Sequence, residues 1–380
     1  MIPYGVKIQL KVLIIVISRM AEVAVYTGGT HMSDISNIDS NFKIETKIKQ
    51  SDIKFYDVNQ PLFRIHGVVY EAGKFRRLPE SVAASVSPGV HALHAHTAGG
   101  RVRFRTDSSY IAINVRMPSI GRMPHFALTG SAGFDMYIYE NTEKYTATFM
   151  PPFSMQKGYE SIFNFGDSKM RDITINFPLY SEVSQLYIGL RETAEVCAPR
   201  QYKIQKPVVY YGSSITQGGC ASRPGNSYES IISRRFDCDY INLGFSGNAK
   251  AEDSIAEYIS KLDMSVFVYD YDHNAPSVQH LENTHEKMFK VIRAANPNLP
   301  IVIMSRPKYY LADDEVVRYE VIKSTYDNAR KIGDNNVYFV DGRTLMNLAG
   351  NEGTVDNCHP NDLGFTSMAR SLETILMKIL

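Results

Sequence analysis

A serine at the end of a short apolar run is the first residue of this chain whose position suggests chemistry. The run Val208–Tyr211 ends in Gly212-Ser213-Ser214. Such a run is typical of a buried parallel strand that delivers a hydroxyl to the carboxyl edge of a sheet, where open α/β sheets bind their ligands. Ser and Gly are also ordinary turn residues. A nucleophile here therefore requires a base, an acid that orients the base, and donors for an oxyanion.

Near the end of the chain, Asp356 and His359 stand three residues apart in the stretch TVDNCHPNDLGF. In a D-x-x-H turn the carboxylate can accept a hydrogen bond from the ring Nδ1–H, which fixes the tautomer and stabilises the imidazolium. The other interpretation is a helix-start or metal-binding histidine. Of other possible ligands in this stretch, only Cys358 is adjacent.

Two glycine- or asparagine-containing turns could supply oxyanion donors. Gly247 lies in NLGFSGN after one predicted strand, and Asn274 lies in YDYDHNAP after the next. Together with the Ser214 N–H they would make three donors, and the loss of one such donor typically costs about 100- to 1,000-fold in rate. Taken alone, each of these segments is an ordinary turn after a strand. An oxyanion hole is expected only because three such turns follow successive strands in this order.

The elements that must position these residues alternate between strand and helix from residue 206 onward. This alternation predicts a parallel sheet covered by helices on both faces. The strands are predicted at 207–211, 240–243, 266–269, 301–304 and 337–340, and the helices at 228–236, 254–262, 281–295, 315–331 and 362–379.

The preceding region, residues 42–200, has the short alternating runs of antiparallel strands and no helix-period segment of useful length. A β-sandwich of jelly-roll type is expected there, with strands at 101–104, 110–116, 134–139, 144–149, 173–177 and 185–190. The domain boundary is expected near 199–206, which makes 206–380 the α/β domain. Residues 1–31 are interpreted as a leader or cloning segment, disordered and outside the fold.

Composition excludes several function classes. The 41 basic and 40 acidic residues balance, so nothing favours a nucleic-acid or anionic-membrane partner. The apolar run Val12–Ile17 is too short to span a bilayer, and no integral membrane span is expected. The default compartment is the cytoplasm, although lysines before this run leave export open. Four cysteines without C-x-x-C spacing indicate neither a disulfide scaffold nor a zinc motif.

Four blocks, GSSIT, NLGFSG, the Asn of YDYDHNAP, and DNCHP, resemble the signature blocks of SGNH/GDSL hydrolases. The resemblance covers residues 206–380 and implies a flavodoxin-like three-layer α/β/α fold. Gly133-Phe134-Asp135-Met136-Tyr137 resembles the G-x-D-L-Y signature of a β domain that precedes one branch of these enzymes. What the resemblance implies is acyl-ester hydrolysis with Ser214 as nucleophile, His359 as base and Asp356 as its orienting acid. The Ser214 amide, Gly247 and Asn274 would form the oxyanion hole.

The chain departs from the family pattern at two places. Ser213 replaces the aspartate that usually precedes the nucleophile, and the usual G-x-N-D around the oxyanion Asn is D-H-N-A. His273 therefore crowds Asn274 and is a candidate substrate contact. Arg306, at the end of the fourth strand, is another candidate, with a structural salt bridge as the equal alternative. The absence of a G-x-S-x-G elbow disfavours the α/β-hydrolase fold.

Other clusters have competing interpretations. His91, His94 and His96 resemble a metal tripod, and His94 and His96 would share a face on a strand, but no fourth ligand is apparent. Packing or surface histidines are therefore favoured. Cys220 and Cys358 lie in two site loops, as free thiols or as a disulfide. The aromatic residues of the first half are core, with a sugar-binding platform as the alternative.

The sequence thus predicts a serine esterase that removes short acyl groups, acetyl foremost, from a carbohydrate or related small ester. It requires no metal or cofactor, and its partners are small-molecule or oligosaccharide esters. The alternatives are an arylesterase, thioesterase or lipase, and a glycan-binding protein with a degenerate hydrolase domain.

Overall fold

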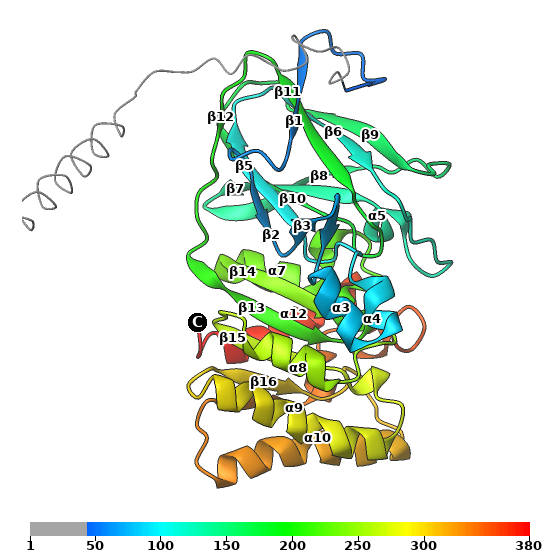
Figure 1. The fold of residues 1–380 in the computed structure, drawn as a ribbon, viewed down its shortest axis with the longest axis vertical. Helices are drawn as coiled ribbons and strands as arrows, with labels where there is room; N and C mark the ends of the chain where they lie inside the picture. The colour runs from blue at the N-terminus through cyan, green and yellow to red at the C-terminus, as the bar shows by residue number, and fades with distance from the viewer. Residues whose placement is uncertain (1–43) are drawn as a thin grey trace, which may run out of the picture. The chain divides into compact units, whose positions relative to one another are not determined.

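Five parallel strands from the second half of the chain form the sheet whose carboxyl edge carries the candidate site (Figure 1). The structure is a computed structural model that describes residues 44–380. The leader expected at 1–31 and the first two residues of the expected β region lie outside the described residues. The strand order β14-β13-β15-β16-β17 is the 2-1-3-4-5 order of flavodoxin-like folds. These strands are β13 (Ile204–Gly212), β14 (Cys238–Gly244), β15 (Val266–Asp270), β16 (Ile301–Met304) and β17 (Val337–Val340).

Helices cover both faces of this sheet, which is why its strands are apolar throughout. Val209 and Tyr211 of β13 point into one core, and Val208 and Tyr210 point into the other. The first core is closed by α8 (Asp253–Ser260), α9 (Val278–Ala295) and α10 (Asp313–Lys331), and the second by α7 (Tyr228–Phe236), α11 (Gly342–Leu345) and α12 (Asp362–Leu376). The three-layer arrangement expected for residues 206–380 is confirmed.

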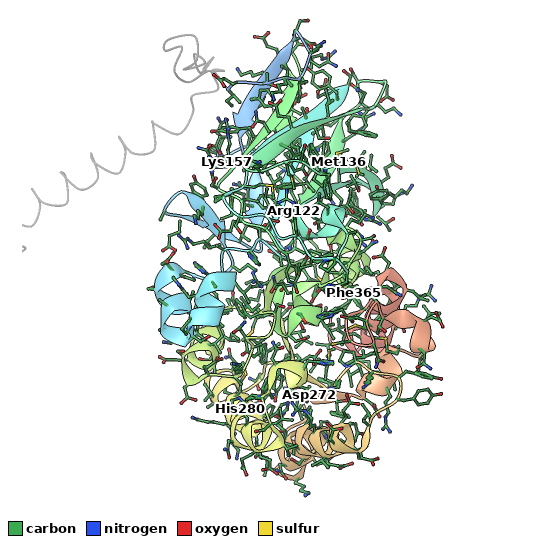
Figure 2. The ribbon with its side chains drawn as sticks, turned by 90° about the vertical axis from the view of Figure 1, so that its right-hand side faces the viewer. Arg122, Met136, Lys157, Asp272, His280 and Phe365 are labelled. Atoms are coloured by element: carbon green, nitrogen blue, oxygen red, sulfur yellow. The ribbon has the colours of Figure 1, made fainter. Side chains whose placement is uncertain are left out.

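The region before β13 is built from antiparallel sheets with one shared apolar core. Met136 of the GFDMY block is fully buried in this core, and Figure 2 shows it in the upper, strand-rich part of the view. One sheet has the order β1-β11-β6-β9, the other has β12-β5-β10-β7-β8 with β2 also paired to β5, and β3 and β4 form a hairpin. The strands are β1 (Ile53–Asp57), β2 (Arg64–His66), β3 (Val69–Glu71), β4 (Lys74–Arg76), β5 (Arg101–Thr106), β6 (Tyr110–Arg116), β7 (Phe134–Glu140), β8 (Thr142–Phe149), β9 (Gly158–Asn164), β10 (Arg171–Asn176), β11 (Gln185–Arg191) and β12 (Val196–Cys197).

Two short helices interrupt this β region, contrary to the expectation of no helix there. They are α3 (Glu80–Val86) and α4 (Pro88–Leu93). Helices of six or seven residues are too short to show a clear 3.6-residue period, and tertiary packing stabilises them instead. Ser87 caps α4 by accepting a hydrogen bond from the Val90 N–H, and Pro88 occupies the first turn. Ala83 and Val90 pack into the same core as α8 and α9.

The remaining elements are single turns. They are α5 (Leu128–Ser131), α6 (Ser214–Gln217), η2 (Pro224–Asn226), η3 (Asp272–Asn274) and η4 (Gly350–Gly353). Within residues 44–380, no helix combines the length and the apolar character needed to cross a membrane.

Candidate active site

Ser214 is the first residue of α6, directly after the central strand β13. Its side chain is 8% exposed, and Ser213 caps the helix by accepting a hydrogen bond from the Ile215 N–H at 3.1 Å. Serine at the position usually held by aspartate therefore supplies the N-cap oxygen that this turn requires. A Cβ at Gly212 would overlap the Asp270 carbonyl and the Thr216 hydroxyl, so only glycine lets the strand turn so sharply into the helix.

The structure brings Ser214, His359 and Asp356 into one hydrogen-bonded chain. Ser214 Oγ lies 2.8 Å from His359 Nε2, and His359 Nδ1 lies 2.7 Å from Asp356 Oδ2. The other carboxylate oxygen of Asp356 accepts hydrogen bonds from the main-chain N–H groups of Cys358, at 3.1 Å, and His359, at 2.7 Å. Partial burial alone would raise the pKa of Asp356, but these hydrogen bonds lower it below its ordinary value. A carboxylate on Nδ1 holds the tautomer in which Nε2 can accept a proton.

The two residues predicted to donate to an oxyanion lie in neighbouring loops. They differ in whether their N–H groups already donate to another residue. Gly247 has φ +70°, and within residues 44–380 no backbone hydrogen bond uses its N–H. The Ser214 N–H belongs to the first turn of α6, where N–H groups have no intrahelical partner. One amide hydrogen of Asn274 is already donated to the Phe245 carbonyl at 2.8 Å. Asn274 therefore fixes the loop that carries Gly247 and has only its second amide hydrogen left for a substrate.

Gln217, at the end of α6, fastens the loop that carries Gly247 to the helix that begins at Ser214. Its Oε1 accepts a hydrogen bond from the Ser246 N–H at 3.0 Å, and its Nε2 donates to the Leu179 carbonyl at 3.2 Å. Gln217 is fully buried. The guanidinium of Arg77 donates to the Gly244 carbonyl and stacks 4.7 Å from the Phe245 ring centroid. The loop at residues 244–248, which carries Gly247, is thus held from two sides.

We expect Gln217→Met to lower kcat for ester hydrolysis by about 10- to 100-fold with little change in KM, because small displacements of catalytic groups are costly. Methionine keeps the volume but removes every hydrogen bond of the Gln217 side chain, so a purely space-filling role predicts wild-type kcat. Steady-state kinetics beside a thermal unfolding curve distinguish the two. Unchanged kcat in the folded variant would contradict the positioning role.

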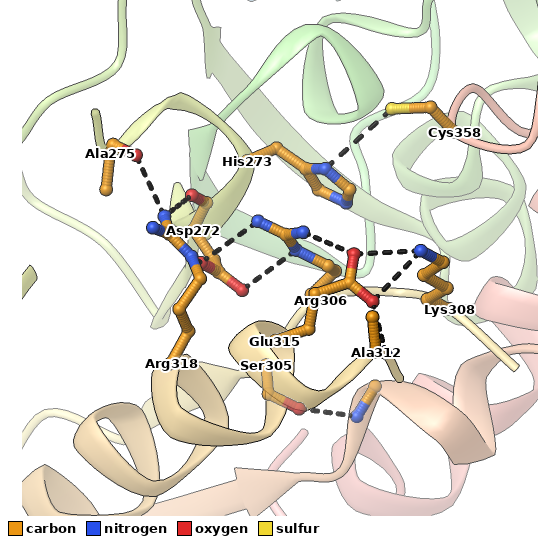
Figure 3. Close-up of polar contacts among 11 residues, drawn as sticks. Asp272, His273, Ala275, Ser305, Arg306, Lys308, Ala312, Glu315, Arg318 and Cys358 are labelled. Atoms are coloured by element: carbon orange, nitrogen blue, oxygen red, sulfur yellow. Dashed lines mark hydrogen bonds and ion pairs between the residues drawn. The ribbon is translucent and has the colours of Figure 1, made fainter. Parts of the chain in front are cut away.

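The two candidate substrate contacts, His273 and Arg306, are both half-buried. His273 Nδ1 faces the Cys358 thiol at 3.7 Å, and its Nε2 is buried without a hydrogen-bond partner within residues 44–380 (Figure 3). Burial lowers the pKa of His273 to about 3, with Arg306 and His359 acting in the same direction. His273 is therefore neutral at physiological pH.

Arg306 takes part in an ion-pair network, the structural alternative to a substrate contact. Its guanidinium contacts Asp272 at 3.1 Å and Glu315 at 2.6 Å (Figure 3). Arg318 also binds Asp272, at 2.6 Å, and donates to the carbonyl of Ala275 at 2.8 Å. These contacts fix η3, the turn that carries Asn274.

Glu315→Gln tests this network through the pH dependence of stability. Burial would raise the pKa of Glu315, but hydrogen bonds from Lys308, the Ala312 N–H and Arg306 lower it from 4.5 to about 2. A lowered carboxyl pKa stabilises the folded state above pH 4.5, and this contribution is lost as the pH falls from 4.5 toward about 2. We expect Glu315→Gln to reduce the free energy of unfolding at pH 7 by about 2 kcal/mol.

Urea unfolding of the two proteins from pH 7 down to pH 3 measures this difference, which should narrow below pH 4.5. Glu320→Gln, on the exposed side of the same helix, is the matched control and should stay within about 0.5 kcal/mol of wild type. A difference that is independent of pH would contradict the network's electrostatic role.

His91, His94 and His96 lie on and after a short helix, not on the strand that was considered for His94 and His96. His91 and His94 lie in and after α4, where His91 Nε2 contacts Glu80 at 2.7 Å. His96 instead faces the Gln217 amide at 3.3 Å. The helix places His91 and His94 one turn apart, so their rings stack with centroids 5.2 Å apart and both face Glu80, whereas His96 does not join them.

All four cysteines are free, so Cys220 and Cys358 are not joined by a disulfide. Burial raises the pKa of the Cys220 thiol to about 12, with Asp356 and Cys358 contributing. Cys220 is therefore protonated and is not itself a nucleophile at neutral pH.

Three residues that the sequence did not single out come from the antiparallel region to the site. The Tyr180 hydroxyl donates to the Ser214 carbonyl at 3.1 Å. The His125 ring lies 5.6 Å from the His359 ring, centroid to centroid. Asp135, from the GFDMY block, accepts hydrogen bonds from the Gly225 N–H at 2.8 Å and from Arg223 at 3.0 Å, in the loop after the nucleophile helix. Only Asp135 had a sequence signal, because it belongs to a motif.

Comparisons with solved structures identify proteins of the same architecture. A protein from Bacteroides ovatus described as a GDSL-like lipase superposes with a TM-score of 0.79 at 26% identity, covering 86% of this chain and 98% of that one. The salicylyl-acyltransferase SsfX3 from a tetracycline biosynthetic pathway has a TM-score of 0.72 at 20% identity, with 87% and 99% covered. An acetyl xylan esterase from the rumen bacterium Butyrivibrio proteoclasticus has a TM-score of 0.55 at 13% identity, with 86% and 98% covered. The last two show a shared fold only.

Family models match both parts of the chain, whereas no curated protein matches it. Residues 53–196 match the N-terminus of the Esterase_SGNH_hydro type, named GxDLY. Residues 205–377 match the GDSL-like lipase/acylhydrolase family. The chain is therefore an ester hydrolase whose residues 205–377 belong to the GDSL-like lipase/acylhydrolase family and follow a GxDLY-type N-terminal region.

Proposed function

We propose that this esterase hydrolyses short acyl esters, acetyl esters foremost, of a carbohydrate or related small alcohol through Ser214, His359 and Asp356. The observation that carries the proposal is the 2.8 Å contact between Ser214 Oγ and His359 Nε2, continued by the 2.7 Å contact to Asp356. A hydroxyl, an imidazole and a carboxylate in this order are what nucleophilic acyl transfer requires.

In the first step His359 Nε2 takes the proton of Ser214 while Oγ attacks the ester carbonyl. The negative charge that develops on the carbonyl oxygen is stabilised by N–H groups of Ser214 and Gly247 and by the second amide hydrogen of Asn274. The protonated His359, stabilised by Asp356, then gives its proton to the leaving alcohol oxygen. Water attacks the carbonyl carbon of the resulting acyl-Ser214 while His359 Nε2 takes one of its protons. His359 then gives this proton to Ser214 Oγ as the Oγ–acyl bond breaks, which releases the carboxylic acid and restores the serine.

The substrate class draws on the kinship of fold with the acetyl xylan esterase. The second candidate is transfer of the acyl group to an alcohol rather than to water, favoured by the higher TM-score of the salicylyl-acyltransferase. Both activities share the acyl-enzyme and differ in the group that attacks it.

A panel of esters distinguishes these activities. The purified protein is assayed with acetyl, butyryl, octanoyl and aryl esters, an acetyl thioester and acetylated xylo-oligosaccharides, with and without an added sugar acceptor. The proposal expects the highest kcat/KM for acetyl groups on the oligosaccharide and free acetate as product. Preference for octanoyl esters or thioesters would overturn the substrate class, and acylated acceptor in place of acetate would favour the transferase. No turnover of any ester would leave a glycan-binding role.

A further inference from the structure

Three side chains with nitrogen or sulfur donors converge beside the candidate nucleophile. They are His125, Cys220 and His359, and one donor atom from each lies within 4.8 Å of the other two. The group is assembled from the antiparallel region, the loop after the nucleophile helix and the loop before α12. No other group of three or more such side chains this close together occurs within residues 44–380. Only His359 has a role in the proposed hydrolysis.

The donor set matches the chemistry of a thiophilic divalent cation. Two imidazoles and one thiolate are typical ligands of Zn²⁺, with Zn–N near 2.0–2.1 Å and Zn–S about 2.3 Å, whereas Mg²⁺ and Ca²⁺ prefer oxygen. Tetrahedral geometry at these bond lengths places donor atoms about 3.5 Å apart. The cluster, whose donor atoms lie within 4.8 Å of one another, therefore needs a contraction of about 1 Å, and His125 is its exposed member.

Two further features prepare this cluster for a metal. Cys220 is 7% exposed, and no hydrogen bond among the described residues uses its thiol. The Nδ1 of His359 is held by the Asp356 carboxylate at 2.7 Å. Metal-binding histidines almost always donate their other ring N–H to such an acceptor, which orients the ring and strengthens the donor nitrogen.

Because Asp356 occupies Nδ1, the nitrogen left for a metal is Nε2, the same atom that faces Ser214 Oγ at 2.8 Å. A nitrogen bound to a metal cannot accept the serine proton. Occupancy of the cluster and hydrolysis are therefore mutually exclusive.

We propose that His125, Cys220 and His359 bind one thiophilic divalent cation of the Zn²⁺ type, and that its binding reversibly blocks ester hydrolysis. The binding itself depends only on the cluster. The inhibition rests on the proposed function, because it requires His359 to be the base. In forming the complex the cation displaces the proton of the Cys220 thiol to solvent, and removal of the cation restores it.

The test uses Co²⁺ and Zn²⁺ with the full-length protein after treatment with a chelator. One equivalent of Co²⁺ should produce a near-ultraviolet cobalt–thiolate charge-transfer band that Zn²⁺ abolishes. The band should be absent in Cys220→Ala and present in Ser214→Ala, so that it reports binding independently of turnover. Cys197→Ala, which removes a half-exposed cysteine of β12, is the matched control and should keep the band.

The second measurement is the Zn²⁺ concentration that halves esterase activity, taken relative to each variant's own uninhibited rate. Cys220→Ala should raise it about 100-fold and His125→Ala about 10-fold, and EDTA should restore wild-type activity. Mg²⁺ and Ca²⁺ should have no effect. Absence of the wild-type band at equimolar Co²⁺ would overturn the site. A cobalt–thiolate band without inhibition by Zn²⁺ would overturn the proposed inhibition but not the binding site. Absence of ester turnover in the metal-free protein would instead count against the proposed function.

Discussion

Ser214→Ala is expected to lower kcat/KM for a short-chain ester by at least about 10,000-fold, because the alanine variant has no atom that can form the acyl-enzyme. The residual rate should reflect only the oxyanion donors and substrate binding. The Ser214 hydroxyl hydrogen-bonds to His359 Nε2, and among residues 44–380 it has no other hydrogen bond. The melting temperature should therefore change little.

Ser213→Ala is the matched control, because it removes the neighbouring hydroxyl. This hydroxyl caps α6, so its loss should reduce the free energy of unfolding by about 1 kcal/mol while most of the activity remains. A fluorophosphonate should add covalently to the wild type and to Ser213→Ala at residue 214, as read by mass spectrometry of peptides. Activity that survives in Ser214→Ala would show that another group performs the chemistry.

Asp356→Asn is expected to have the second-largest effect, about 10,000-fold in kcat. The asparagine side chain fits the same space, but its amide can donate to His359 Nδ1, which leaves the proton on Nε2 and removes the base. Because the Asp356 hydrogen bonds to the Cys358 and His359 main chain are retained by the remaining oxygen, folding should be preserved. The measurement is single-turnover acylation, followed by the release of the alcohol.

Glu352→Gln is the control for Asp356→Asn, because Glu352 is an exposed carboxylate in the same segment before α12. Its activity should match that of the wild type. If Asp356→Asn retained more than about one tenth of wild-type kcat, the carboxylate would not be setting the tautomer, and the triad would reduce to Ser214 and His359.

The secondary structure of the α/β half could be predicted closely from local sequence. The predicted helix at 228–236 and the predicted strands at 301–304 and 337–340 have the bounds of α7, β16 and β17. β16 is fully buried, and Ser227 and Asp237 flank α7, so local preference and tertiary environment agree for these elements. In the β region, the short strands β1 to β4 and β12 were missed, as were α3 and α4, because segments this short carry little periodic signal. The seven-residue strand β9 was also missed, and Tyr159 is its one buried residue.

The sequence alone was enough to predict Ser214, Asp356 and His359 as the catalytic residues, from their residue types, their spacing and the resemblance of their blocks to the family. Only the tertiary structure decided what surrounds them. In the folded chain, Asn274 donates one amide hydrogen to the Phe245 carbonyl, and Arg306 takes part in an ion-pair network. The His125 ring lies beside the His359 ring. These contacts join segments from 29 to more than 200 positions apart, and neither the period of a strand nor the composition of a turn encodes which distant segment will pack against it. The candidate nucleophile Ser214 could therefore be predicted from the sequence, whereas the contacts that Tyr180 and His125 of the antiparallel region make beside it could not.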